Sequence, residues 1–528
     1  MITINNIKLP ISDDESVLQQ KIHDKLRKSN KDFEYKILKK SLDARKKEQI
    51  HYVYKLLVNV DEKSLSKKLL SDKDISVFNE EPKIPLKKGD KKLENPILVV
   101  GMGPAGLFCA YKLISYGYDV ILCEQGSDVD KRAIDVKTFI KTGILNENSN
   151  VQFGEGGAGT FSDGKLTSRS KDPRGFEVLE IFHKFGAKEE ILYSQKPHIG
   201  TDILTKIVKN MRLKMIENGA KVYFNTKLED IIVENSKIRA VVLNGKKVDV
   251  SIVVFATGHS SEQIYKMLHS HDVALTQKPF AVGFRIEHLQ SDINLMQYKN
   301  AADNKYLPAA EYFFTNAVEK TNKSVYTFCM CPGGFVLPSS SIKEHLVVNG
   351  MSFSKRAGKN SNSALLVNVN DKDFGANLFD GIAFQRKIER DAFRLGGGGY
   401  KAPVQKLSDF LNDNVSTELG KVSPTYPIGY TLTNLSILYP KNLTESLKAA
   451  LHSLGKVAPI FANGDAILTA PETRTSAPVR IVRDPENYNS VTLQNMYPIG
   501  EGSGYAGGIV SSAIDGLKIA EKIISIYV

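Results

Sequence analysis

The sequence is poor in cysteine, in long apolar runs and in the marks of an export signal. Its four cysteines (Cys109, Cys123, Cys329 and Cys331) are too few and too scattered for a disulfide scaffold, so we expect a reducing, cytoplasmic setting. Residues 97–113 form the most apolar stretch, but three glycines and a proline interrupt it, which favours strand, loop and helix over a membrane span. The N-terminus has no apolar core behind a basic start, and we expect neither a signal peptide nor a membrane contact.

The positive charge of the chain is unevenly distributed. The formal net charge is +12, and residues 1–94 hold 22 Lys and Arg against 16 Asp and Glu. Half of the excess therefore lies in less than a fifth of the sequence. Such a segment can bind nucleic acid, an anionic membrane or an acidic protein, but a solvated lysine-rich surface is the favoured interpretation.

The N-terminal segment has the pattern of a small domain that mixes helix and strand. Residues 2–9 predict a strand, 16–26 an amphipathic helix, 35–42 a helix or a strand, and 50–60 a strand with alternating apolar side chains. Residues 79–95 are lysine-rich and show no apolar periodicity, which is typical of a linker.

A glycine-rich loop follows the first strongly apolar strand. Ile97–Val100 leads into Gly101-Met102-Gly103-Pro104-Ala105-Gly106, after which helical spacing begins. Gly101 permits a tight turn, Gly103 lets backbone amides approach a pyrophosphate, and Gly106 allows close packing of helix on sheet. The next predicted strand, 119–123, ends before Glu124, whose carboxylate suits an adenosine ribose hydroxyl and repels a 2′-phosphate. The pattern predicts a dinucleotide site.

Three later segments indicate FAD rather than NAD. Residues 152–164 are dense in glycine, so their backbone can pass close to a flat ring or a pyrophosphate. Residues 253–258 predict a strand that ends in Ala-Thr-Gly. Residues 497–508 return to glycine before a predicted helix over Ile509–Ile526, whose positive end favours an anionic flavin or pyrophosphate.

Three further motifs are Ser149–Phe153, Phe328–Gly334 and Glu472–Arg480. With the glycine elements, they make the chain resemble the glutathione-reductase-type FAD superfamily and, more narrowly, the bacterial family of uncharacterised FAD-dependent proteins known as NAD(FAD)-utilising dehydrogenases. The resemblance covers essentially the whole chain and implies FAD binding and a two-lobed fold, but no substrate. Many relatives in the superfamily have Asp after the glycine of the last strand, where this chain has Glu501; Asp465 is the second-ranked match.

We therefore predict an α/β protein with a Rossmann-type FAD-binding domain, an inserted α+β substrate lobe and a small N-terminal α+β domain. The predicted boundaries are 1–80 for the basic N-terminal domain, 81–95 for the linker, 96–278 for the first part of the FAD-binding domain, 279–488 for the inserted lobe and 489–528 for the last part of the FAD-binding domain.

The predicted FAD contacts come from all four glycine-bearing elements and their neighbours. They are Gly101, Gly103, Pro104, Ala105, Gly106, Glu124, Gln125, Arg132, Gly156, Gly157, Ala158, Gly159, Thr160, Ala256, Thr257, Gly258, Gly500, Glu501, Gly508 and Ile509.

The catalytic residues are unknown from the sequence, but Arg474, Arg480 and His259 are candidates. With Arg483, the two arginines can hold an anionic substrate or an anionic reduced flavin, unless they pair with nearby acids such as Glu472 on a surface loop. His259 directly follows Ala-Thr-Gly and is a candidate acid near the flavin, or else a helix-capping residue.

Cys329 and Cys331 form a C-x-C pair. Residues two apart in a strand point to the same face, and two small buried side chains are favoured over a strained disulfide or a redox relay. Two thiolates without further ligands do not complete a tetrahedral set, so we predict no metal site.

We expect an FAD-dependent oxidoreductase that holds FAD non-covalently and acts on a small molecule, anionic if the arginines face it. No second GxGxxG unit follows, so a nicotinamide dinucleotide that binds transiently, the substrate itself or a protein partner must supply electrons. Two alternatives stay open: a flavin-dependent RNA-modifying or RNA-binding protein anchored by its N-terminal domain, and a redox-sensing flavoprotein without turnover. The N-terminal segment has no RNP-like aromatic motif, which counts against nucleic acid.

Overall fold

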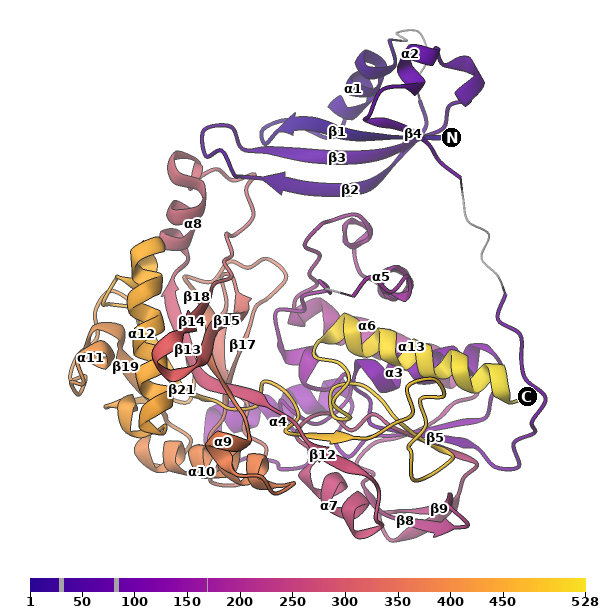
Figure 1. Cartoon of the computed structure of the whole chain (residues 1–528), viewed down its shortest axis with the longest axis vertical. Coiled ribbons are helices and arrows are strands. Elements are labelled where there is room, and N and C mark those ends of the chain that lie inside the picture. The colour runs from indigo at the N-terminus through magenta and orange to yellow at the C-terminus, as the bar shows by residue number, and fades with distance from the viewer. Residues whose placement is uncertain (28–32, 80–84, 169) are drawn as a thin grey trace.

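The chain folds into a nucleotide-binding unit, a second lobe on a large sheet and a small N-terminal domain (Figure 1). The computed structural model describes residues 1–27, 33–79, 85–168 and 170–528. The nucleotide-binding unit has a parallel sheet and the second lobe a largely antiparallel one, which confirms the predicted mixed α/β fold class.

The N-terminal domain packs one helix against a four-stranded antiparallel sheet. Its elements are β1 (Ile2–Pro10), α1 (Val17–Leu26), β2 (Tyr35–Asp43), β3 (His51–Val58), α2 (Lys67–Leu70) and β4 (Ile75–Val77). The sheet order is β2-β3-β1-β4, and Ile4, Leu56 and Leu18 contribute to the core between sheet and helix. The segment predicted as helix or strand is therefore the edge strand β2.

The N-terminal domain contacts both other parts of the molecule. The Lys40 backbone N–H in β2 donates to the Tyr193 carbonyl at 2.7 Å, and the Gln195 N–H donates to the Lys40 carbonyl at 2.9 Å. The hydroxyl of Tyr52 in β3 donates to the carbonyl of Tyr306 at 3.2 Å. One contact reaches the nucleotide-binding unit and the other reaches the second lobe.

A five-stranded parallel sheet forms the centre of the nucleotide-binding unit. Its strands are β5 (Ile97–Val100), β6 (Val120–Cys123), β7 (Lys221–Tyr223), β11 (Ile252–Phe255) and β23 (Met496–Pro498). They lie in the order β23-β11-β5-β6-β7, so the last strand pairs with the first part of the unit. All side chains of β5 and β11 are buried because parallel strands of this kind are covered on both faces.

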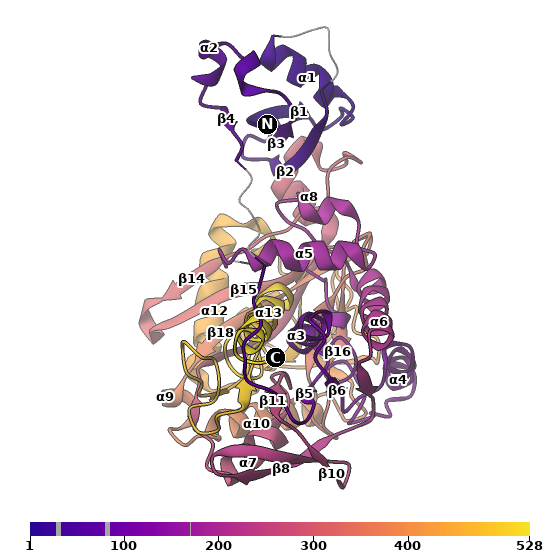
Figure 2. The ribbon, with the colours of Figure 1, turned by 90° about the vertical axis from the view of Figure 1, so that its right-hand side faces the viewer.

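Helices cover one face of this sheet, and a small antiparallel sheet with one helix covers the other (Figure 2). The first layer contains α3 (Pro104–Ser115), α5 (Arg174–Lys184), α6 (Thr201–Glu217) and α13 (Ile509–Ile526). The second contains β8 (Leu228–Glu234), β9 (Lys237–Leu243), β10 (Lys246–Asp249) and α7 (Glu262–Ser270). Helix α4 (Val129–Thr142) follows β6.

Helices α3 and α13 approach each other very closely. A Cβ on Gly516 of α13 would lie 2.2 Å from the carbonyl oxygen of Ala105 in α3, so only glycine fits there. The contact brings the first and the last segments of the nucleotide-binding unit together, and both helices begin at the same edge of the parallel sheet (Figure 1).

The second lobe is built on a seven-stranded sheet. Its strands are β13 (Phe280–Leu289), β14 (Thr315–Val318), β15 (Lys323–Cys331), β18 (Asn360–Val369), β19 (Ala402–Lys406), β20 (Tyr430–Leu432) and β21 (Ile467–Glu472). The sheet order is β14-β15-β18-β13-β21-β19-β20, and only the β19–β20 pair is parallel. Its helices are α8 (Gln290–Tyr298), α9 (Asp371–Phe374), α10 (Asp380–Leu395), α11 (Leu407–Leu411) and α12 (Lys441–Val457).

Two short strand pairs complete the fold. The hairpin β16 (Phe335–Pro338) and β17 (Val348–Met351) lies beside the large sheet. Strands β12 (Leu275–Gln277) and β22 (Val479–Ile481) pair where the chain enters and leaves the second lobe. Within the described ranges, no helix has both the length and the apolar composition that a membrane crossing requires.

Candidate functional site

A cavity of about 1550 Å³ lies between the nucleotide-binding unit and the second lobe. Its wall includes Val100, Cys123 and Ala256, at or next to the carboxyl ends of β5, β6 and β11. Ligands of open α/β sheets bind at this edge. Pockets for one small ligand usually measure about 300–1,000 Å³, so this cavity has room for a large cofactor together with a substrate.

The wall on the side of the nucleotide-binding unit is formed largely by backbone. At Gly101, where φ is +101°, a Cβ would lie 2.5 Å from the carbonyl oxygen of Ala256. At Gly106 it would lie 2.0 Å from the carbonyl oxygen of Gly101. Gly103 is different: its φ is −70°, and a Cβ there would meet no protein atom closer than the Gly157 Cα at 4.0 Å. The space in front of Gly103 is therefore open to a ligand.

Two helix N-termini face this wall. Gly103 precedes α3 and Gly508 precedes α13; both glycines line the cavity, and neither helix has a side-chain cap. The first N–H groups of a helix have no partner within the helix and carry a partial positive charge. The cavity therefore offers donors for an anion at two points.

Glu124 holds the loops of this wall in place. Its Oε2 accepts from the Met102 N–H at 2.9 Å, and its Oε1 accepts from the N–H groups of Gly126 and Gly154, each at 2.9 Å. A carboxylate has about four acceptor positions, so one remains for a ribose hydroxyl. Glu124 also lines the cavity, as its predicted role requires.

Arg132 lies behind the wall rather than in it. The side chain is fully buried, and its guanidinium donates to the carbonyls of Asn150, Val151, Gly154 and Glu155 at 2.7–3.3 Å. These bonds shape the glycine segment. The prediction that Arg132 contacts FAD does not agree with this position, because its N–H groups already donate hydrogen bonds to backbone carbonyls.

The structure brings most predicted cofactor contacts together in the cavity wall. Those that line it are Gly101, Gly103, Pro104, Ala105, Glu124, Gln125, Gly157, Ala158, Gly159, Ala256, Thr257, Gly258, Gly500, Glu501, Gly508 and Ile509. Gly106, Gly156 and Thr160, like Arg132, are outside the lining. They pack within the loops behind the cavity wall. A Cβ on Gly156, for example, would lie 2.0 Å from Oγ1 of Thr160.

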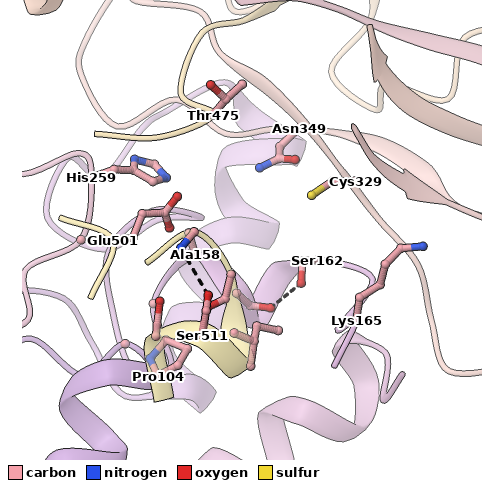
Figure 3. A pocket seen from close by; sticks show the side chains of 18 of the residues that line it. Pro104, Ala158, Ser162, Lys165, His259, Cys329, Asn349, Thr475, Glu501 and Ser511 are labelled. Carbon is pink, nitrogen blue, oxygen red and sulfur yellow. Dashed lines mark hydrogen bonds between the residues drawn. The ribbon is translucent and has the colours of Figure 1, made fainter. Parts of the chain in front are cut away.

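Glu501 lies in the wall next to the start of α13, opposite the second lobe (Figure 3). Burial raises its pKa to about 7, although the charge of Lys278 opposes this shift. The rival match, Asp465, lies in the second lobe before β21 and does not line the cavity; its carboxylate accepts from the Lys421 N–H. This placement agrees with the ranking of Glu501 over Asp465.

His259 is close to Glu501 in the same wall (Figure 3). Its Nδ1 lies 2.9 Å from Oγ of Ser260, and burial together with the charge of Arg474 lowers its pKa to about 4. The imidazole is therefore neutral at pH 7 and is not a source of a proton there. The role as an acid near the flavin requires a protonated imidazole and stays a prediction.

The three arginines Arg474, Arg480 and Arg483 have different environments. Arg474 lines the cavity, but it forms a two-pronged ion pair with Glu389, at 2.9 and 3.0 Å, and donates to Ser341 at 2.7 Å. Arg483 pairs with Asp515 at 2.7 Å. Arg480 is exposed and lies outside the main cavity, 5.2 Å from the ring centre of Tyr505.

Glu389 is the acidic partner of Arg474. Burial alone would raise the pKa of Glu389, but the charges of Arg474 and Arg386 outweigh it and lower the pKa to about 2. Glu389 also accepts from Thr473 at 2.8 Å. The guanidinium of Arg474 already binds a carboxylate of the chain, and its role as an anion clamp stays a prediction. The alternative, pairing with nearby acids on a surface loop, is wrong for Arg474, since its partner is Glu389 and this ion pair is buried.

Cys329 is not the buried strand residue that the alternating pattern predicts. A β-bulge between Phe328 and Cys331 interrupts the pairing of β15 with β18, and Cys329 has φ of +41°. Its side chain is exposed to the cavity opposite Glu501, whereas Cys331 is buried (Figure 3). The surrounding protein raises the pKa of the Cys329 thiol to about 12, so this thiol is neutral at pH 7.

A buried ion pair lies beneath this bulge. Arg285 of β13 is fully buried and pairs with Glu472 of β21 at 3.0 Å. Its Nη2 also donates to the Cys329 carbonyl at 3.0 Å and contacts the sulfur of Cys331 at 3.4 Å. At Gly350 a Cβ would lie 1.8 Å from this guanidinium, so the backbone of β17 passes directly over it.

Sequence reasoning missed the charged residues at one end of the cavity. Lys165 lies 3.0 Å from Glu311, Lys196 pairs with the same carboxylate at 2.5 Å, and Arg356 pairs with Asp163. All five line the cavity and join the two lobes. They are far apart in the sequence, and no spacing pattern connects them.

The residues present fit FAD. The dinucleotide needs a stretch of backbone without side chains, N–H donors for its phosphates and an acceptor for its ribose, and the wall provides each of these. Gly103, Gly157 and Gly508 would hold the pyrophosphate or the ring, and Glu124 would hold the ribose.

Comparisons with known proteins agree with this assignment. The family model "FAD-dependent protein, C-terminal domain-like" matches residues 279–475, and a domain of unknown function matches residues 1–59. The first match confirms the prediction that the cofactor is FAD. An "Uncharacterized protein" of Clostridium beijerinckii is 47% identical over 526 residues, which cover 99% of this chain and 98% of that protein.

More distant similarities are to a thiazole synthase, a glycine oxidase and a protein solved in complex with FAD. The thiamine thiazole synthase of Aeropyrum pernix is 27% identical over 186 residues, covering 32% of this chain and 57% of that protein. Glycine oxidase from Bacillus cereus covers 81% of this chain and 95% of its own, at 14% identity and a TM-score of 0.31. CtdE in complex with FAD covers 81% and 83%, at 10% identity and a TM-score of 0.33.

Proposed function

We propose a function from one premise: the chain belongs to the same family as the uncharacterized protein of Clostridium beijerinckii. The proposed function is that of an FAD-dependent oxidoreductase, of the glutathione-reductase-type superfamily, that acts on a small molecule in the cavity between the two lobes. The observation that carries it is the size and composition of this cavity. One wall is open backbone with helix N-termini, and the opposite wall consists of side chains from another lobe.

Bound FAD supplies the hydride or electron transfer. The residues of the chain supply binding and enclosure. Gly103 and Gly508 precede helices whose first N–H groups have no side-chain cap, Glu124 presents a carboxylate oxygen, and the second lobe forms the opposite wall. Neither His259 nor Cys329 carries a charge at pH 7, so neither adds a charge to the site.

The purified protein tests this proposal. We expect it to show the absorbance of oxidised flavin near 450 nm, to release FAD on denaturation, and to lose this absorbance when NADH, NADPH or a substrate is added without oxygen. A colourless protein that does not take up added FAD would contradict the proposal. A flavoprotein that no donor reduces would favour redox sensing without turnover over catalysis.

The RNA-binding alternative has weaker support from the N-terminal domain. Proteins that read RNA on a four-stranded sheet stack bases on aromatic side chains of the open face. Here the tyrosines Tyr52 and Tyr54 alternate with Val53 and Lys55, and Tyr54 lies in the core on the helix side. The open face carries Lys55 and its cross-strand neighbour Lys39 instead, so it has charge but no stacking platform.

A further inference from the structure

Most positive side chains around the cavity already have an acidic partner. Lys165 and Lys196 pair with Glu311, and Arg356 pairs with Asp163. The ion pairs Arg474–Glu389, Arg285–Glu472 and Arg483–Asp515 account for the arginines that flank the second lobe. An anionic ligand therefore finds no free cation among these groups.

Lys278 and Arg480 are different, because neither has an ion pair within the part of the chain that the structure describes. Lys278 follows β12 and donates to the Ser476 hydroxyl at 3.3 Å. Arg480 lies in β22, which pairs with β12, and its guanidinium stacks on Tyr505. Burial and the nearby charge of Arg480 lower the pKa of Lys278. The charge of Glu501 opposes this shift, but Glu501 forms no ion pair with either cation among the described residues, so two positive charges lie close together without a paired acid.

Lys278 lines a side groove of about 550 Å³ that adjoins the main cavity. Tyr326, Phe328, Thr475, Gly507 and Ser511 line both spaces, so the groove leads to the start of α13. Gly504–Ala506 also line the groove, and the side chain of Arg480 lies against this segment, with its Cβ 3.0 Å from the Cβ position of Gly504.

The walls of this groove are aromatic. Tyr326 and Phe328 are two apart on β15, with ring centres 6.4 Å apart at nearly a right angle, and both are only partly buried. Tyr505 also lines the groove, and its ring centre lies 5.2 Å from the guanidinium of Arg480 and 3.8 Å from that of Arg483. Aromatic faces suit a flat ring, and unpaired cations at the mouth suit an anion.

We propose that this side groove, lined by Lys278, Tyr326, Phe328 and Tyr505 and flanked by Arg480, admits an anionic ligand that carries a planar ring. The anion binds Lys278 and Arg480, and the ring passes between the aromatic side chains toward the cavity. Two sources share this chemistry: the phosphates of a nicotinamide dinucleotide, and the carboxylate of an aromatic substrate. The inference rests on the proposed function, for which it names the entry site of the donor or of the substrate.

Calorimetric titration of the purified protein with NADP⁺, NAD⁺ and benzoate tests the groove without turnover. We expect at least one probe to bind, and the double variant Lys278→Ala/Arg480→Ala to weaken its binding about tenfold or more, with a dependence on salt. The variant Lys278→Arg/Arg480→Lys keeps both charges and is expected to retain most of the affinity. Lys237→Ala/Lys246→Ala, which removes two exposed cations of β9 and β10, is the matched control.

The probe that responds identifies the source. Weakening for a dinucleotide alone assigns the groove to the electron donor, and weakening for benzoate alone assigns it to the substrate. Unchanged binding by the double variant, equal loss in the control, or no binding of any probe by the wild-type protein would overturn the proposal. Flavin absorbance recorded on the same samples separates this outcome from failure of the proposed function, because a yellow protein with unchanged probe binding refutes the groove alone.

Discussion

The two walls of the cavity are made of different parts of the polypeptide. On the side of the nucleotide-binding unit, glycines expose backbone N–H groups and leave space in front of them. On the side of the second lobe, the wall consists of side chains whose charges are paired with one another, as in Arg474–Glu389 and Arg285–Glu472. The first wall is built to accept a fixed cofactor. In the second wall, ion pairs neutralise most charges, so recognition of a ligand there depends on the few charged groups without a partner.

The largest expected effect comes from breaking a buried pair under the side-chain wall. Arg285→Met leaves Glu472 buried without its partner, and we expect the free energy of unfolding of this lobe to fall by about 3–5 kcal/mol. Arg285→Met/Glu472→Met removes both charges and should recover most of this loss. Urea denaturation followed by circular dichroism measures both. Arg390→Met, at an exposed position of α10, is the control. If the single and double variants were equally unstable, packing rather than charge would dominate this wall.

On the backbone wall, two neighbouring glycines should separate folding from cofactor binding. In Gly101→Ala the added Cβ meets the Ala256 carbonyl at 2.5 Å, at a φ that alanine disfavours, so we expect a loss of about 1–3 kcal/mol in stability. In Gly103→Ala the backbone is compatible and the space is open, so the stability of the FAD-free protein should change little.

The same Gly103→Ala methyl group projects into the cavity. We expect FAD affinity to fall about tenfold, which is about 1.4 kcal/mol. Flavin fluorescence during titration of the FAD-free protein measures this affinity, and thermal unfolding measures stability. Full FAD affinity in Gly103→Ala would show that the dinucleotide does not pass in front of this loop.

The smallest effect concerns Glu501, whose pKa is raised to about 7 by burial. The folded FAD-free protein then holds this proton up to higher pH than the unfolded chain does. Its contribution to stability is complete below the ordinary pKa of about 4.5 and is lost as the pH rises through 7. Glu501→Gln removes this dependence. We expect the Tm of the wild type to fall relative to that of the variant by about 2 °C between pH 5 and pH 8. Parallel Tm curves would contradict a raised pKa.

The sequence predicted correctly those parts of the structure that depend on residues adjacent in the chain. The loop Gly101–Gly106, the strand Ile97–Val100 and the helix Ile509–Ile526 follow from short patterns, because turn, strand and helix geometry depend on neighbouring residues. Glu124 was placed at the wall for the same reason, although its three bonds to backbone N–H groups were not predicted.

The second wall depends on residues that meet only after folding. Arg474, which follows β21, finds its acid 85 positions away in Glu389 on α10, and nothing next to it in the sequence indicates this. The alternation that predicted Cys329 to be buried fails because a β-bulge, held by Arg285, turns its side chain into the cavity. Pairing across the fold thus decided which of the predicted charged and thiol groups are available to a substrate.

The N-terminal domain limits how the two lobes can move. Backbone bonds join its edge strand β2 to Tyr193 and Gln195, which come directly before Lys196 in the cavity wall. On the other lobe, Tyr52 holds the carbonyl of Tyr306, on the segment that leads to Glu311. A rigid four-stranded sheet therefore spans two segments that border the same opening. The lobes cannot separate at that end unless the backbone bonds of Lys40 or the hydroxyl bond of Tyr52 break, so this domain links the two lobes.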